Sequence, residues 1–203
     1  MAWTDKTVAL ENDQVLLRPI DAKDRTELRS IALDDRIWKY FVVNAGTESG
    51  FDGFFDAQLR NHANRTAIVF TIVDKSSGRL AGGMSFGNLA EAEDRIEIGS
   101  SWLGREFQGQ GINRWAKYLL LEHAFETLNA QRVEFKTDVL NQQARAGLRK
   151  IGATEEGVLR SFNYMPGNRR RDAIYYSILA DEWPHVKDQL LSKAPVVREE
   201  AQR

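Results

Sequence analysis

The chain has 203 residues, with 28 basic and 29 acidic side chains, a formal net charge of −1 and 42% hydrophobic residues. This composition is typical of an ordinary globular domain and lacks the basic field that attracts nucleic acid, which excludes that class of partner. Cysteine is absent, so disulfides, cysteine-ligated clusters and thiol nucleophiles are excluded as well.

The sequence does not indicate a metal centre, a membrane segment or a leader peptide. The histidines, His62, His123 and His185, are too scattered to suggest metal ligation. The N-terminus lacks the basic start and apolar stretch of a signal peptide, and no apolar run reaches the ~20 residues of a membrane helix. A cytoplasmic protein without a metal or a membrane association is therefore expected.

The first half of the chain is predicted to combine strands with amphipathic helices. β-branched apolar runs indicate strands, a Ser-Gly turn joins two of them into a hairpin, and phenylalanines recurring at helical spacing indicate a helix. The predicted elements are strands over 14–20, 66–73 and 80–86 and helices over 26–33 and 49–61.

The second half is predicted to begin with a strand, a helix and a parallel strand, followed by a helix and a hairpin. Gly152 is the predicted C-cap of the later helix. Residues 193–203 are mostly polar and expected to fray, so residues 1–192 are predicted to form a single α/β domain. The predicted elements are strands over 95–103 and 132–139, helices over 112–128 and 141–150, and a hairpin of 157–162 and 173–179.

A loop with two glycines joins the strand ending at Leu103 to the helix beginning at Ile112. Such a loop presents backbone N–H groups at the positive end of the helix dipole and favours a phosphate or pyrophosphate. A Walker loop is excluded because it requires Lys and Ser or Thr where Ile112 and Asn113 stand. A dinucleotide fingerprint is excluded because it requires a third glycine where Arg114 stands. The pattern Gln/Arg-x-x-Gly-x-Gly/Ala matches Gln108 to Asn113 except at its last position.

These motifs follow one another in the order LLRPI, EIGSSWL, GQGINRWAKYLLLEHAFE, RVEFKTD, Asn141 and DEWP, over nearly the whole chain. Because it contains these motifs in this order, the chain resembles the GNAT superfamily of N-acetyltransferases. Within the superfamily it is most similar to the branch of ribosomal-protein N-terminal (alanine/serine) acetyltransferases. The resemblance implies an α/β fold with a mixed, largely antiparallel sheet. Its central parallel strand pair would be splayed around the cofactor and flanked by helices. It also implies acetyl-coenzyme A as co-substrate.

The resemblance assigns the coenzyme to two parts of the chain. Backbone amides of the glycine loop would hold the pyrophosphate, with Arg114 adding a charge-assisted contact. The pantetheine arm would lie between the splayed strands, beside Trp102 and Leu103, and Asn141 would hydrogen-bond it. A helix N-cap is an equally good reading of Asn141. The implied cofactor-binding residues are Trp102, Leu103, Gln108, Gly109, Gln110, Gly111, Ile112, Asn113, Arg114 and Asn141.

Glu97 is the candidate general base, since it occupies the carboxylate position that the family's E-I-G segment suggests. Its alternative role is a cross-strand salt bridge with a basic neighbour. Relatives place a serine three residues, or a tyrosine seven residues, after the asparagine, where this chain has Ala144 and Leu148. Three options follow for the general acid: another donor such as Ser101, Tyr164 or Tyr175, a water, or no efficient catalysis at all.

The expected function is transfer of acetyl from acetyl-coenzyme A to a primary amine, by direct attack in a ternary complex. The acceptor would be a protein N-terminus or a small-molecule amine, and a homodimer is possible through an exposed edge strand of the final hairpin. Two alternatives stay open: a non-catalytic module that binds or senses acyl-coenzyme A, and a nucleotide binder using the same loop. The run Arg169-Arg170-Arg171 is typical of a solvated loop, with an anionic acceptor or the 3′-phosphate as its alternative partner.

Overall fold

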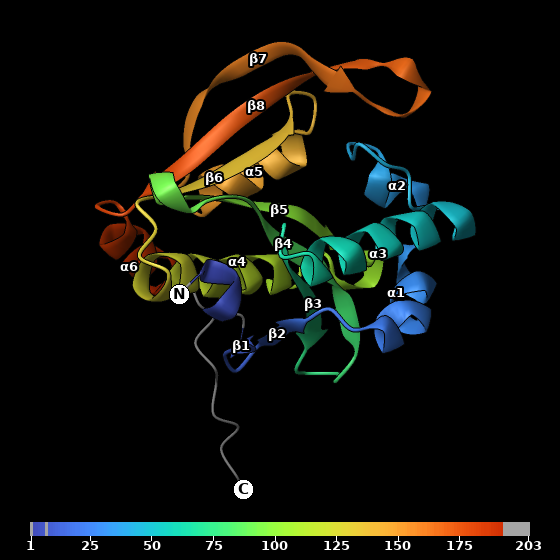
Figure 1. Ribbon diagram of the computed structural model, residues 1–203, viewed down its shortest axis with the longest axis horizontal. Helices are drawn as coiled ribbons and strands as arrows, with labels where there is room; N and C mark the ends of the chain where they lie inside the picture. The colour runs from blue at the N-terminus through green and yellow to red at the C-terminus, as the bar shows by residue number, and fades with distance from the viewer. Residues whose placement is uncertain (1, 7, 193–203) are drawn as a thin grey trace, which may run out of the picture.

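The computed structural model describes residues 2–6 and 8–192 and is built around one eight-stranded sheet (Figure 1). The strand order is β1-β2-β3-β4-β5-β6-β8-β7. Neighbouring strands run antiparallel except for β5 and β6, which run parallel, so the predicted mixed sheet with a central parallel pair is confirmed. The strands are β1 Leu10–Glu11, β2 Val15–Pro19, β3 Ile68–Asp74, β4 Leu80–Ala90, β5 Arg95–Leu103, β6 Arg132–Asp138, β7 Thr154–Tyr164 and β8 Arg170–Leu179.

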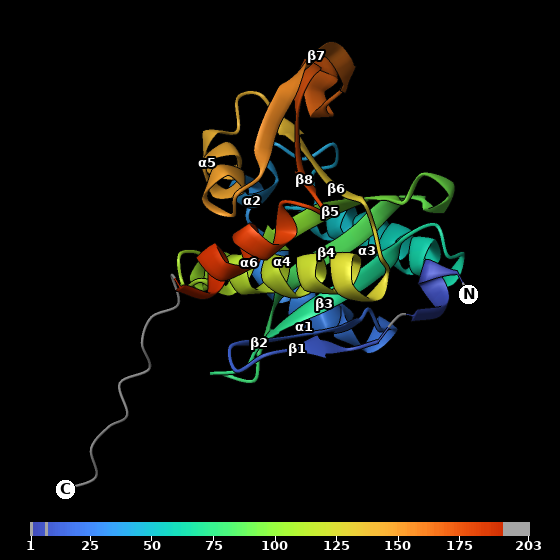
Figure 2. The same ribbon diagram turned by 90° about the vertical axis from the view of Figure 1, so that its left-hand side faces the viewer.

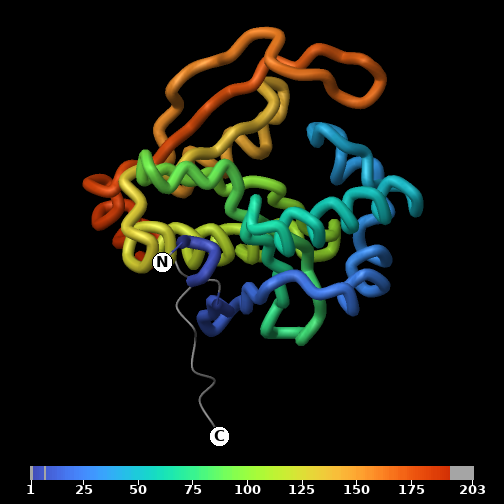
Figure 3. Tube along the Cα trace, viewed as in Figure 1, coloured from blue at the N-terminus to red at the C-terminus, as the bar shows by residue number. Residues whose placement is uncertain are grey.

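Helices cover both faces of the sheet. α1 and α3 pack on one face of β3 and β4, whereas α4 packs on the opposite face, beside α6 (Figures 1 and 2). α5 lies against β6. The β7–β8 hairpin projects from the body of the molecule on the same side as α2 (Figure 3). The helices are α1 Arg25–Ala32, α2 Asp35–Trp38, α3 Glu48–Ala63, α4 Ile112–Glu122, α5 Gln142–Lys150 and α6 Trp183–Ser192.

The longest predicted helix is divided in the structure. The α-helical part ends at Glu122, and a π-helical turn, His123–Thr127, follows it, closed by a hydrogen bond from the Leu128 N–H to the His123 carbonyl (3.0 Å). Hydrophobic spacing does not distinguish these two helix types over a single turn, because both keep the apolar side chains on one face.

Short or unusual elements have little signal in the sequence. β1 and α2 have two and four residues, too few to show a period. α6 has Pro184 at its second position, which suggests a break; a proline there is tolerated because the N–H of the first turn has no intrahelical acceptor. The predicted frayed tail lies outside the described residues. Within residues 2–6 and 8–192, no helix has both the length and the hydropathy needed to cross a membrane.

Candidate functional site

The candidate site lies where β5 and β6 separate. Parallel pairing between them ends at Glu97 on β5 and Glu134 on β6, although β5 continues to Leu103 and β6 to Asp138. Beyond this point, within the described residues, β5 and β6 no longer pair, and each strand turns backbone N–H and C=O groups toward the gap between them. Two such edges can accept hydrogen bonds from, and donate them to, an extended molecule placed between them.

A β-bulge in β5 accompanies the separation. On β4 a single residue lies between Gly83 and Ser85, whereas their β5 partners, Trp102 and Gly99, are separated by two residues. The first of these two, Ser100, has a φ of 49°, in the left-handed region. A bulge bends its strand and changes the direction of the side chains within it. The bulge therefore explains both the divergence of β5 and which serine faces the site.

A polar cavity of about 310 Å³ opens at the bulge. The Lys136 Nζ donates to Glu97 Oε2 over 3.3 Å, and the Glu97 side chain is 14% exposed. The same Nζ lies 5.4 Å from the ring centroid of Phe162 and 5.6 Å from that of Tyr175, so two aromatic rings and a carboxylate surround this ammonium. The cavity is lined by Ser85, Gly87, Asn88, Glu97, Gly99, Ser100 and Lys136.

The position of Glu97 is compatible with both roles considered for it, general base and salt-bridge partner. Its carboxylate makes the predicted cross-strand ion pair, with Lys136, and it also borders the cavity. The ion pair occupies Oε2 and holds the carboxylate in place. A Cβ on Gly99 would lie 3.4 Å from Oε1, so the glycine keeps this second oxygen uncrowded. The arrangement suits a carboxylate that accepts a proton from a group in the cavity.

The two candidate serines differ in position. The Ser101 Oγ donates to the Gly99 carbonyl at the limiting distance of 3.5 Å, and Ser101 is not among the residues lining the cavity. Ser100 lines it instead. Ser101 is a predicted candidate proton donor and Ser100 is not, and the sequence carries no signal for the bulge that places Ser100 at the cavity wall.

The two candidate tyrosines also differ. Tyr175 lies on β8 opposite Lys136 of β6, with its ring near the Lys136 ammonium. Tyr164 is 63% exposed at the end of β7, under the guanidinium of Arg170. The structure thus brings Tyr175 close to the Glu97–Lys136 pair and leaves Tyr164 on the surface.

The glycine loop presents an open backbone surface. Gly109 and Gly111 have φ values of 80° and 85°, which favour glycine. A Cβ on Gly109 would meet no atom within 4 Å, and one on Gly111 would meet only Trp115, at 3.9 Å. The first helical hydrogen bond of α4 joins the Trp115 N–H to the Gly111 carbonyl (3.0 Å), and the amides before it have no intrahelical acceptor. These features fit an anion lying over the loop.

Side chains of the loop support its own backbone. The Gln108 Nε2 donates to the Leu103 carbonyl (3.1 Å), and the Gln110 side chain donates to the Glu106 carbonyl. The guanidinium of Arg114 lies 4.7 Å from the ring centroid of Trp115.

A buried lysine lies on α4 next to the loop. Lys117 is 8% exposed, and its Nζ donates to the Asn113 Oδ1 over 3.0 Å. Burial disfavours the charged form and lowers the pKa of Lys117 to about 8. The burial of Lys117 has no signal in the sequence, since a lysine among apolar helix residues usually extends its ammonium to water.

The residues proposed to contact pantetheine take part in the fold as well. The Asn141 Oδ1 accepts from the Ala144 N–H (3.0 Å) and caps α5, which uses only the oxygen of the side-chain amide. Trp102 is 6% exposed, and its ring lies 5.2 Å from that of Trp38. Leu103 is also buried. The side chains of Trp102 and Leu103 therefore belong to the core, and any contact with a ligand would use their backbone.

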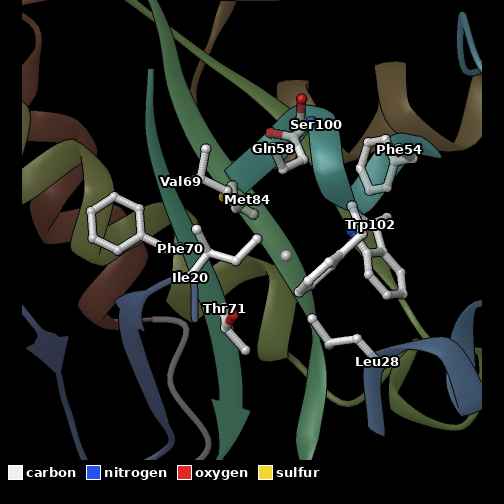
Figure 4. A pocket seen from close by; sticks show the side chains of 12 residues that line it. Ile20, Leu28, Phe54, Gln58, Val69, Phe70, Thr71, Met84, Ser100 and Trp102 are labelled. Atoms are coloured by element: carbon white, nitrogen blue, oxygen red, sulfur yellow. The ribbon is translucent and has the colours of Figure 1, made fainter. Parts of the chain in front are cut away.

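A second, apolar cavity of about 20 Å³ lies between α3 and the sheet (Figure 4). Leu28, Phe54 and Trp102 border it, and Ser100 lies at its edge, so it adjoins the polar cavity. Its volume suits a single water molecule at most, which marks it as a packing gap beside the site. In residues 2–6 and 8–192 no group of three or more His, Asp or Glu side chains is placed to hold a metal ion.

The fold and the site define an acetyltransferase of the GNAT family. Residues 14–154 match the model of the "Acetyltransferase (GNAT) domain", and the chain belongs to this family. The chain is 30% identical over 177 residues to the Bacillus subtilis (strain 168) protein named "Putative ribosomal N-acetyltransferase YdaF", covering 85% of this chain and 94% of the relative. The predicted resemblance to the GNAT superfamily is thereby confirmed, and the name of this relative agrees with the predicted ribosomal-protein branch.

Solved structures share the fold. A GCN5-related N-acetyltransferase from Brucella melitensis superposes with a TM-score of 0.85 at 24% identity, over 92% of this chain and 85% of that one. RimJ from Mycobacterium smegmatis, in complex with CoA-disulfide, gives a TM-score of 0.78 at 23% identity, over 95% of this chain and 97% of that one.

Proposed function

We propose that this protein transfers an acetyl group from acetyl-coenzyme A to the primary amine of a peptide or protein N-terminus, by direct attack in a ternary complex. The observation that carries the proposal is the Glu97 carboxylate, held by Lys136 at the edge of a polar cavity where β5 leaves β6. Family membership supports the reaction class, and the relative named as a ribosomal N-acetyltransferase supports the acceptor class.

The proposed coenzyme site consists of the glycine loop and the gap between β5 and β6. Backbone amides of the glycine loop and the first turn of α4 would hold the pyrophosphate, because the loop surface is open and the first-turn amides have no intrahelical acceptor. Arg114 would add a charge-assisted contact. Backbone of β5 near Trp102 and Leu103, and the side-chain amide of Asn141, would hold the pantetheine arm. When bound, acetyl-coenzyme A supplies the thioester carbonyl that the amine attacks.

Glu97 would take a proton from the acceptor's ammonium group. An α-amine has a pKa of about 7.7–8.0 and is partly neutral at pH 7, whereas a lysine amine, at about 10.4, is almost wholly protonated. An N-terminal acceptor therefore asks less of this base than a lysine side chain does. Tyr175 is the proposed proton donor to the departing thiolate, because its ring lies near the Lys136 ammonium. Ser100 replaces Ser101 as the alternative candidate for this proton donor, because Ser100 lines the cavity.

The test is release of coenzyme A thiol in the presence of peptides that begin with Ala or Ser. Glu97→Gln should lower kcat by about 10²–10⁴-fold while leaving the acetyl-coenzyme A Kd unchanged. Glu93→Gln is the matched control, since Glu93 is an exposed carboxylate just before β5. Silence of the unmodified protein across peptides and small-molecule amines would refute the proposal.

Ala144 and Leu148 favour a second candidate function. Neither residue can donate a proton, and Leu148 is buried, so a module that binds acyl-coenzyme A without turnover is the alternative. This alternative predicts tight coenzyme binding, no thiol release with any amine and no functional effect of Glu97→Gln.

We also propose a cytoplasmic location and a homodimer formed through β7. This strand forms one of the two edges of the sheet and exposes several apolar side chains. Light scattering after gel filtration measures the assembly, and a monomeric mass at tens of micromolar would rule out a stable dimer. The exposed side chains are Val158, Leu159, Phe162 and Tyr164.

A further inference from the structure

One cationic side chain in the neighbourhood of Glu97 has no ion-pair or hydrogen-bond partner among the described residues. Lys136 pairs with Glu97, and Arg169 pairs with Asp138. Arg171 is 5% exposed, yet its guanidinium makes no hydrogen bond or ion pair with any residue in 2–6 or 8–192, and its Nε is fully enclosed. The solvated loop expected for this arginine run is therefore wrong for Arg171.

Strand register places Arg171 on the face of the sheet that carries the site. Arg171 and Tyr175 are four residues apart on β8, so they share a face, and Tyr175 is the partner of Lys136 on β6. Burial lowers the pKa of Arg171, while Asp138, Tyr175 and Glu97 act in the opposite direction, so these groups lie within electrostatic range of its charge.

A buried charge without a partner strongly destabilises a fold unless a ligand compensates it. The other charges nearby are already paired. An anion delivered by the ligand would restore the balance, and a guanidinium is suited to bind a carboxylate with two parallel hydrogen bonds.

We propose that Arg171 binds a carboxylate of the acceptor, so that the preferred acceptor carries this group close to its reactive amine. The inference rests on the proposed function and names its substrate class. The amine end of such an acceptor meets the carboxylate of Glu97, and its carboxylate meets Arg171, which makes the charges complementary at both ends. The carboxylate can belong to an acidic residue following the peptide's N-terminus or to a free amino acid.

The experiment compares matched acceptors that differ by one charge. The peptide Ser-Glu-Ala-Gly is set against Ser-Gln-Ala-Gly, and free serine against serine amide, so that the two sources of a carboxylate are separated. Calorimetry measures acceptor binding in the presence of coenzyme A, and thiol release measures kcat/KM. In at least one of the two pairs, the unmodified protein should prefer the acceptor with the additional carboxylate by about ten- to hundredfold.

Arg171→Met should reduce this preference to near parity, while the acetyl-coenzyme A Kd stays within twofold. Arg171→Lys keeps a positive charge and should retain part of the preference, which preserves the test if Arg171→Met folds poorly. Arg170→Met is the matched control, because Arg170 is the exposed neighbour on the same strand.

Equal binding of charged and neutral acceptors to the unmodified protein overturns the proposal, whether or not turnover occurs. A tenfold or greater loss of acetyl-coenzyme A affinity in Arg171→Met, with the acceptor preference intact, also overturns it and assigns Arg171 to a coenzyme phosphate. Preferential binding of a charged acceptor without thiol release would support the role of Arg171 and count against the proposed function alone.

Discussion

Replacement of Lys117 by methionine is expected to stabilise the protein at neutral pH. Methionine has a similar length and fills the buried space without a charge. Burial lowers the pKa of Lys117 from 10.5 to about 8, and each pKa unit corresponds to about 1.4 kcal/mol. The protonated lysine therefore destabilises the fold by about 3 kcal/mol below pH 8.

This penalty has a defined pH dependence. The folded-state pKa lies below the unfolded value, so the unfolded chain binds more protons, and stability rises as the pH increases from about 8 to about 10.5. The advantage of Lys117→Met should consequently shrink from about 3 kcal/mol at pH 7 to about half of that value at pH 9.5.

Urea denaturation at pH 7 and pH 9.5, followed by circular dichroism, measures both quantities. Lys150→Met is the control, because Lys150 is exposed in the last turn of α5 and its removal should change stability little at either pH. An unchanged or lowered stability of Lys117→Met at pH 7, or a gain that does not diminish at pH 9.5, would show that Lys117 carries no desolvation penalty.

The remaining predictions concern the proposed site. Gly111→Val and Gly78→Val should each lower the free energy of unfolding by about 1–3 kcal/mol, because both glycines have positive φ in open space. Only Gly111→Val should weaken acetyl-coenzyme A binding in calorimetry, by tenfold or more. Equal Kd values for the two variants would remove the loop from the coenzyme site. Ser100→Ala should lower kcat/KM more than Ser101→Ala, and the reverse order would contradict the role given to the bulge. Asn141→Asp should keep the helix cap and melt within about 2 °C of the unmodified protein, whereas Asn141→Ala should lose about 1 kcal/mol; both should weaken coenzyme binding, and full affinity in Asn141→Asp would reduce this residue to a cap.

The layout of the fold followed from local sequence signals, but the shape of the site did not. Alternating and 3.6-residue patterns place β5, α4 and β6 within a residue or two of their observed bounds, apart from the π-helical end of α4. The bulge at Ser100 arises from the pairing of β5 with β4, which is a property of two strands together. A single strand carries no sign of it, so the sequence alone could not show that Ser100, rather than the candidate Ser101, lines the cavity.

Lys136 and Arg171 show a related limit. A lysine or arginine normally extends its charged end into water. The sequence alone therefore favours a solvated loop for Arg171, with an anionic partner only as the alternative. Their importance comes from what the sheet places around them: the rings of Phe162 and Tyr175 for Lys136, and an enclosed, unpaired position for Arg171. Glu97 could be singled out because the family resemblance marked its position, whereas its partner could not.

The short seam between β5 and β6 divides the sheet into two leaves. Backbone pairing joins the leaf of β1–β5 to the leaf of β6–β8 only from Arg95 to Glu97 within the described register. Pantetheine contains two amide groups, and a molecule of this kind lying in the gap would extend the seam in the manner of an added strand. The proposed acceptor site would draw on both leaves, since Glu97 comes from one and Lys136 and Arg171 from the other. Coenzyme bound in the gap would therefore set the distance between the two halves of the acceptor site, which makes coenzyme first and acceptor second the natural order of binding.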